Sequence, residues 1–103
     1  MIRKAFRMSV HKGREDEYAR RHNPIWQELA DTLVAHGVSN YSIFLDRQTG
    51  DLFAYAEIES DARWDEIAET EVCRRWWQYM RELMPSKPDG EPISRALPEV
   101  FHL

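Results

Sequence analysis

The spacing of apolar residues along this chain changes four times, and these changes constrain the fold more than any other feature. Residues 2 to 10 alternate apolar and polar side chains, although Lys4 interrupts the apolar face. This alternation predicts a half-buried strand. From about residue 14 to 36 the spacing becomes three and four, which predicts one stripe of an amphipathic helix. The residues of that stripe are Tyr18, His22, Ile25, Leu29, Leu33 and His36.

A proline interrupts this helical stripe. Inside a helix, Pro24 would remove a backbone hydrogen bond and clash with the preceding turn. Asn23-Pro24 also suits an N-cap followed by a first helical residue. We therefore expect a kink or two short helices, with the break just after His22. A break in the backbone hydrogen bonds of the helix beside a histidine is a place where a ligand can approach.

The rest of the chain predicts a hairpin, a second helical region and a last strand. Residues 38–46 and 52–59 alternate again, and Gly50 lies in the turn between them. Helical spacing follows from about residue 61, with a second helix entry near Thr70 and a stop at Pro85. After a proline-rich loop, residues 93–103 are predicted as the last strand, and Pro98 places that strand at an edge or a bulge.

This order of elements is that of the ferredoxin-like βαββαβ fold, an α+β architecture. It gives an antiparallel four-stranded sheet with its helices on one face. A chain of 103 residues predicts a single domain over 1–103. The other sheet face, on which we expect residues such as Phe6 or Phe44, would be open. A second subunit packed sheet against sheet would cover it, so we predict a homodimer of the dimeric α+β barrel type.

Composition excludes several classes of protein. The net charge of −4, from 14 basic and 18 acidic residues, does not suit a nucleic-acid partner. No apolar run approaches the ~20 residues that span a bilayer, and the first residues lack the apolar core of a signal peptide. The single cysteine, Cys73, cannot form an internal disulfide. We expect a cytoplasmic protein with no membrane association.

Tyr18 and His22 are the first candidates for chemistry. They lie four residues apart, so on a helix their side chains are neighbours. Histidine both gives and takes protons near neutral pH, and a tyrosine hydroxyl beside it can orient a substrate. A packed or solvated structural histidine is the alternative, and the adjacent Asn23-Pro24 break favours the functional interpretation.

Three more aromatic residues are candidates for binding. Trp76 and Trp77 are adjacent on a predicted helix and point about 100° apart. We therefore expect one of them to line a groove or an interface, although both could fill core and subunit contacts. Aromatic rings pack on the C–H faces of sugars, and an indole N–H donates a hydrogen bond. Tyr41 lies on the opposite strand face from Phe44 and is either a pocket hydroxyl or an ordinary sheet aromatic.

The sequence predicts no metal and no cofactor. Its four histidines, His11, His22, His36 and His102, are scattered without HxH or HExxH spacing. Glycine-rich phosphate loops, GxSxG elbows and GxGxxG motifs are missing from the sequence.

Two long motifs resemble the L-rhamnose mutarotase family. Residues 17–26, EYARRHNPIW, are similar to that family's YxxRHNPIW motif, and residues 72–80, VCRRWWQYM, are similar to VCxRWWxYM. Residues 2–6, 40–46 and 57–60 also match. The resemblance covers essentially the whole chain, with looser agreement in residues 86–94 and at the hairpin tip.

The resemblance implies a dimeric α+β barrel that needs no metal and interconverts the α and β anomers of L-rhamnose in rhamnose catabolism. Such an enzyme is an isomerase. The resemblance implies His22 as proton donor and Tyr18, Tyr41, Trp76 and Trp77 as sugar-binding residues. Each of these positions holds the family's residue here.

The chemistry expected of His22 follows from how anomers exchange. The ring oxygen must be protonated and the anomeric hydroxyl deprotonated, after which the opened chain rotates about C1–C2 and closes again. We expect His22 to protonate the ring oxygen and later to remove that proton. The partner at the anomeric hydroxyl, a tyrosine hydroxyl or a water, stays open at the level of sequence.

Two other functions fit the same predicted fold. One is a cofactor-free monooxygenase or a haem-handling protein, because one fold supports many sites. The other is a non-catalytic sugar-binding module. The sequence also leaves open which further sugars are accepted, which of Trp76 and Trp77 stacks on the sugar, and whether the last strand crosses to the partner subunit.

Overall fold

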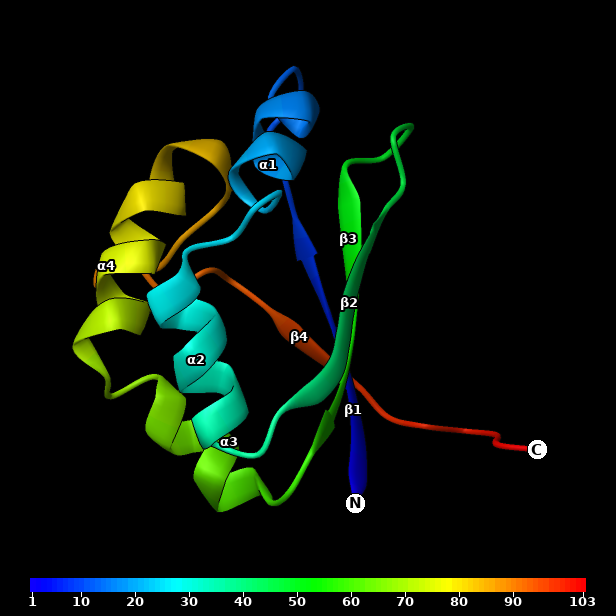
Figure 1. The fold of residues 1–103 in the computed structure, drawn as a ribbon. Coiled ribbons are helices and arrows are strands. Elements are labelled where there is room, and N and C mark those ends of the chain that lie inside the picture. The colour runs from blue at the N-terminus through cyan, green and yellow to red at the C-terminus, as the bar shows by residue number, and fades with distance from the viewer.

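The computed structural model describes all residues from 1 to 103 and places the helices on one side of a sheet (Figure 1). The strands are β1 (Ile2–Ser9), β2 (Ser39–Leu45), β3 (Asp51–Ile58) and β4 (Arg95–Leu97). The helices are α1 (Glu15–Arg21), α2 (Gln27–Ala35), α3 (Asp61–Ile67) and α4 (Glu71–Met80), followed by the 3₁₀ turn η1 (Arg81–Leu83).

The four strands form one antiparallel sheet in the order β2-β3-β1-β4. Strands β1 and β3 pair without interruption from Ile2 opposite Ile58 to Ser9 opposite Asp51. The pairing of β2 with β3 contains a bulge between Ser39 and Ser42. This arrangement confirms the predicted ferredoxin-like α+β fold.

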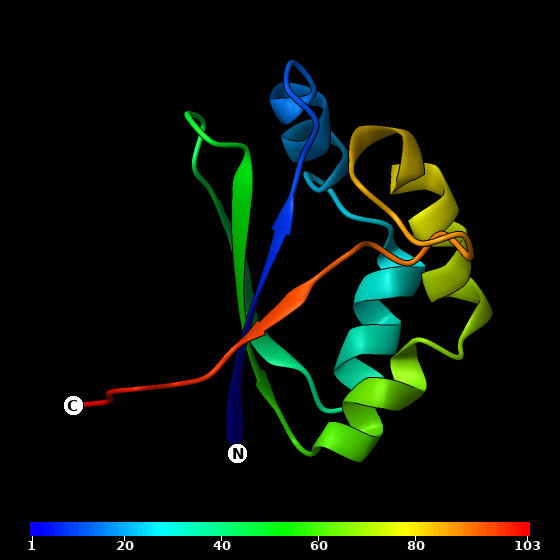
Figure 2. The ribbon, with the colours of Figure 1, turned by 180° about the vertical axis from the view of Figure 1, so that it is seen from behind.

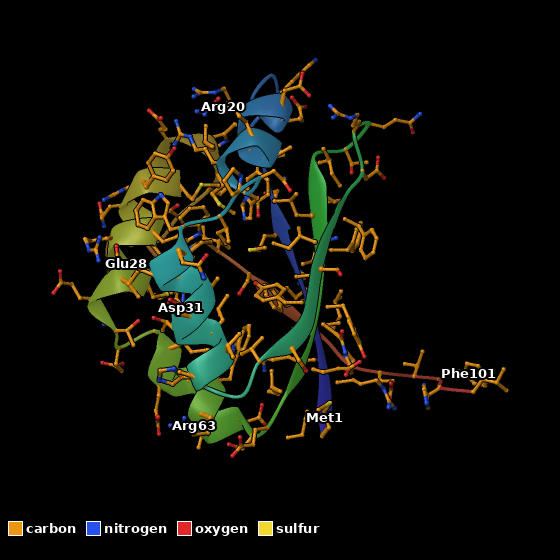
Figure 3. The ribbon with its side chains drawn as sticks, in the orientation of Figure 1. Met1, Arg20, Glu28, Asp31, Arg63 and Phe101 are labelled. Atoms are coloured by element: carbon orange, nitrogen blue, oxygen red, sulfur yellow. The ribbon has the colours of Figure 1, made fainter.

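The core lies between the sheet and the helices. Alternate residues of β3 are almost fully buried and point toward the helices: Leu52, Ala54, Ala56 and Ile58. From the helical side, Val72, Trp76 and Met80 of α4 meet them with the spacing of one helix face. Charged side chains such as Arg20, Glu28 and Asp31 are exposed on the helices (Figure 3). None of the helices has the length and apolar character needed to cross a membrane.

The predicted break after His22 is confirmed, but the predicted cap is wrong. Helix α1 ends at Arg21 and α2 begins at Gln27, with Trp26 rather than Asn23 in the N-cap position. The side-chain amide of Asn23 instead donates to the carbonyl of Ala19 at 2.7 Å. Asn23 therefore closes the end of α1 by giving a second donor to a carbonyl of the last helical turn, which also accepts the backbone N–H of His22 at 3.1 Å.

The second helical region also divides in two, as predicted. The hydroxyl of Ser60 accepts a hydrogen bond from the backbone N–H of Arg63, and that of Thr70 accepts one from the N–H of Cys73. These two N-caps begin α3 and α4.

Of the two phenylalanines predicted on the open sheet face, the position of Phe6 is corrected and that of Phe44 is confirmed. Phe6 does not lie on the open face: it pairs with the buried Ala54 and contacts Tyr41 and Trp64 beneath the helices. Phe44 does lie on the open face and is 65% exposed. An alternating pattern defines two faces but not which one is covered, and the interruption at Lys4 obscured the choice.

The last strand is shorter than predicted. Only Arg95–Leu97 pairs with β1, and the residues after it leave the sheet as an extended tail on the side away from the helices (Figure 2). Pro98 follows the last paired residue directly and has no N–H to donate to a neighbouring strand. Phe101 lies near the end of this tail, far from the helical layer (Figure 3).

Candidate active site

A cavity of about 900 Å³ opens between the helices and the covered face of the sheet. Its wall is mostly apolar and aromatic, which is typical of small-molecule sites of this size. The structure brings together every residue that the sequence proposed for the site. These residues are Tyr18, His22, Tyr41, Trp76 and Trp77.

His22 stands directly after the last residue of α1, and a backbone contact fixes its ring. Its Nδ1 lies 2.9 Å from the carbonyl oxygen of Tyr18. A carbonyl only accepts hydrogen bonds, so Nδ1 carries the proton that is donated to it. In the neutral ring the other nitrogen, Nε2, is then an acceptor. The end of α1 thus holds an imidazole in one tautomer at the wall of the cavity.

Burial lowers the pKa of His22, because it penalises the charged imidazolium. The hydrogen bond to the Tyr18 carbonyl opposes this shift without cancelling it. His22 is consequently neutral at pH 7, and its Nε2 is able to take up a proton.

Aromatic rings hold His22 on two sides. The ring of Tyr18 stacks on it with centroids 4.4 Å apart, and Trp76 meets it edge-on at 5.2 Å. Trp26 and Tyr79 extend this cluster, and each has its ring centroid within 5.7 Å of that of Trp76. The contacts limit the orientations open to the imidazole and give it an environment of low polarity.

The two tyrosines of the cavity keep their protons at neutral pH. Burial is the main cause that raises the pKa of Tyr18, and the charge that Tyr41 would carry adds to it. Burial likewise raises the pKa of Tyr41, with a smaller contribution from Cys73. Both hydroxyls are therefore suited to donating hydrogen bonds rather than to acting as bases.

Both tryptophans line the cavity. This corrects the expectation that only one of them would line a groove or an interface. Trp76 is buried. Trp77 is half-buried and packs against two groups of buried residues, one that contains Leu52 and Met80 and one that contains Ala56 and Ile58. An apolar helix face is about 100° wide or more, so two adjacent positions both fit on the side of α4 that faces the sheet.

Lys4, Phe6 and Trp64 also lie in the cavity wall, and sequence reasoning did not propose them for the site. Phe6, Tyr41 and Trp64 form a second aromatic cluster with ring centroids 5.8 to 6.3 Å apart. The ammonium of Lys4 lies 5.9 Å from the centroid of Trp64. For Lys4 and Phe6 the alternation of β1 was an available signal, because both share the face of Met8. Trp64 left no such signal, since its position depends on where α3 packs.

The structure contains no group of three or more potential metal ligands. Cys73 is buried in α4, and this burial raises the pKa of its thiol to about 11. Its surroundings are those of a packed structural residue rather than of a reactive thiolate.

Fold and site together define a ferredoxin-like α+β protein with an aromatic small-molecule pocket and a histidine in its wall. A family model described as L-rhamnose mutarotase matches residues 3–103. An L-rhamnose mutarotase of Opitutus terrae is 63% identical over the whole of this chain and 99% of the relative. The chain belongs to the L-rhamnose mutarotase family.

Solved structures agree with this assignment. The crystal structure of an L-rhamnose mutarotase from Formosa agariphila has a TM-score of 0.92 and 39% identity, covering 100% of this chain and 99% of that one. A putative antibiotic biosynthesis monooxygenase from Nitrosomonas europaea has a TM-score of 0.66 with 10% identity, covering 98% of this chain and all of that one. The second likeness shows the shared fold alone.

Proposed function

We propose that this chain is an isomerase that interconverts the α and β anomers of L-rhamnose. The observation that carries the proposal is His22, which is held in one tautomer with its Nε2 available at the wall of an aromatic cavity. Membership of the L-rhamnose mutarotase family supplies the identity of the sugar.

The proposed reaction moves two protons and breaks one ring bond. The ring oxygen gains a proton while the anomeric hydroxyl loses one, and the C1–O5 bond opens to an aldehyde. Rotation about C1–C2 presents the other face of the carbonyl. The ring oxygen then attacks that face, gives back its proton, and the former carbonyl oxygen is protonated.

His22 is the proposed catalytic residue at the ring oxygen. Nε2 first takes up a proton from solvent water, and the resulting imidazolium is a good acid because burial disfavours its charge. It protonates the ring oxygen during opening and recovers that proton during closure, so the enzyme ends in the state in which it began.

The remaining cavity residues bind the sugar in this proposal. Since Tyr18 and Tyr41 stay protonated, we propose that their hydroxyls donate hydrogen bonds to the sugar. A water molecule then accepts the proton of the anomeric hydroxyl. Trp76 and Trp77 pack on the C–H face and the C5 methyl group of the pyranose.

Exchange spectroscopy tests the activity without a coupled assay. Equilibrated L-rhamnose gives separate proton signals for its two anomers, and saturation of one signal is transferred to the other only if they interconvert. We expect the protein to increase this transfer strongly at catalytic concentrations. Binding without increased transfer would favour the non-catalytic sugar-binding module.

We further propose that two copies pack through their open sheet faces. Phe44 and Phe53 are cross-strand neighbours on that face and are 65% and 40% exposed. In the tail, Val100 and Phe101 are also largely exposed, and the tail leaves the sheet on this side (Figure 2). A second copy would remove these apolar side chains from water.

Two general properties complete the proposal. We propose that residues 1–103 act as a single domain, because one cavity takes its wall from β1, α1, β2 and α4 together. We also propose that the protein acts in the cytoplasm, which suits a free cysteine and an enzyme of sugar catabolism.

A further inference from the structure

Lys4 is the one lysine or arginine in the wall of the cavity. It lies on β1 opposite Ala56, which is fully buried, so its side chain leaves the strand on the face covered by helices. Only 29% of that side chain is exposed. A lysine at this position places a charge among apolar residues and costs desolvation.

The contacts of Lys4 within the protein are weak. Its Nζ lies 3.5 Å from a carboxylate oxygen of Asp61, whose own side chain is 68% exposed. The ring centroid of Trp64 is 5.9 Å away. An ammonium has three N–H donors, and an exposed ion pair of this length contributes little to stability. Neither contact explains why a lysine occupies the cavity wall.

Two clusters of side chains line the same cavity of about 900 Å³. His22, Tyr18 and Trp76 form one cluster, and Lys4 belongs to the other, with Trp64. If the anomeric carbon and ring oxygen face His22, the hydroxyls on C2, C3 and C4 are the sugar's polar groups left to be recognised.

We propose that Lys4 is a substrate-binding residue whose ammonium donates hydrogen bonds to the C2–C4 hydroxyls of the sugar. This inference rests on the proposed function and deepens it. By holding that edge, Lys4 fixes the pyranose with its ring oxygen toward His22. A cation also favours hydroxyl-rich ligands over apolar ones in an otherwise aromatic cavity.

Three variants separate this role from a structural one. Lys4→Met removes the ammonium and retains the length of the side chain. Asp61→Asn removes the carboxylate partner and leaves Lys4 in place. Lys12→Met removes the same charge from the exposed loop after β1, outside the cavity. Circular dichroism and thermal unfolding establish that each variant is folded, and Lys4→Arg, which keeps the charge, serves if Lys4→Met does not fold.

The readout is the exchange rate between L-rhamnose anomers as a function of sugar concentration. We expect Lys4→Met to raise KM roughly tenfold or more, which is the loss expected for a hydrogen bond from a charged group. Lys4→Arg should recover part of it, and Asp61→Asn and Lys12→Met should stay within about twofold of the wild type. An unchanged KM in Lys4→Met, or an equal loss in Asp61→Asn, would overturn the proposal.

Deoxy sugars locate the contact. With the wild type, one of the 2-, 3- and 4-deoxy analogues should lose about as much affinity as Lys4→Met loses for L-rhamnose. In Lys4→Met, that analogue and L-rhamnose should bind equally. Equal losses in both proteins for all three analogues would overturn the contact. A wild type that does not exchange anomers would overturn the proposed function itself, so the two failures are distinguishable.

Discussion

At the scale of single residues, the site depends on a contact that makes one nitrogen of His22 a donor and leaves the other for chemistry. The carbonyl of Tyr18 accepts the Nδ1 proton, while its ring stacks on the imidazole. Tyr18 therefore fixes the tautomer of His22 through its carbonyl and packs on the imidazole ring. Its hydroxyl is the group that we propose to bind the sugar. The four-residue spacing predicted that the two side chains are neighbours, but it could not predict the backbone contact, which requires the non-helical end of α1.

The lowered pKa of His22 predicts how stability changes with pH. In the unfolded chain the imidazole takes up a proton near its ordinary value of about 6.5, whereas in the folded protein it resists protonation to lower pH. Between these two values the unfolded state binds more protons, so the free energy of unfolding falls as the pH falls. Denaturant unfolding between pH 5 and 7.5 measures this slope.

The matched comparison uses two histidine variants. His22→Asn should flatten the slope below pH 6.5, whereas His11→Asn, at an exposed position, should leave it unchanged. Parallel pH profiles for the wild type and His22→Asn would contradict the assignment of a buried neutral imidazole.

At the scale of elements, α1 is held against the end of α4 by Arg21, the residue before His22. Its Nε donates to Glu17 at 2.7 Å and its Nη2 donates to Glu82 at 2.6 Å. Its Nη1 donates to the backbone carbonyl of Tyr79, and the guanidinium lies 4.3 Å from the ring centroid of that residue. Arg21 is a positioning residue, since it fixes the helix end that carries His22.

Arg21→Met should therefore weaken both folding and catalysis. Its side chain is only 9% exposed, so loss of its charged hydrogen bonds should cost about 2 kcal/mol and lower Tm by roughly 10 °C. We expect the exchange rate at saturating sugar to fall more than the affinity does. The neighbouring Arg20→Met, at an exposed side chain, should change both quantities little. Equal effects at the two positions would show that Arg21 does not position His22.

The elements themselves were largely predictable from sequence, and their exact ends were not. Changes in the spacing of apolar residues located every strand and both helical regions. Pro24 located the break in the first helical region. The side chain of Asn23 caps α1 rather than α2 because Ala19 offers a carbonyl within reach. The last strand ends at Leu97, directly before Pro98, and its length also depends on pairing with β1, a partner about ninety residues away along the chain. Local patterns carry no information about such partners.

At the scale of the whole molecule, the sheet divides the protein into a side that carries the cavity and an open side. The helices cover one face of the sheet (Figure 1). The cavity opens on that side, and the exposed Phe44 and Phe53 lie on the other face. The same topology in a putative antibiotic biosynthesis monooxygenase at 10% identity shows that the fold is shared with proteins of very different sequence. The two motifs that resemble this family contain four of the five residues proposed for the site: Tyr18, His22, Trp76 and Trp77.

The proposed homodimer predicts the effect of a charge on the open face. Phe53→Glu should shift the protein toward monomer, because two copies would bury like charges in one apolar contact. Val34→Glu adds the same charge at an exposed position on α2 and should leave the assembly unchanged. Sedimentation velocity over a range of concentrations measures the result. A wild type that sediments as a monomer throughout would contradict the proposed dimer.

One measurement tests both the role of His22 and the interconversion of the L-rhamnose anomers. Saturation transfer between the two anomeric proton signals is recorded with equal concentrations of wild type and of folded His22→Ala. We predict strong transfer with the wild type and a loss of about a hundredfold or more with the variant, in line with the contribution of general acid–base catalysis. Near wild-type transfer with His22→Ala would contradict the account.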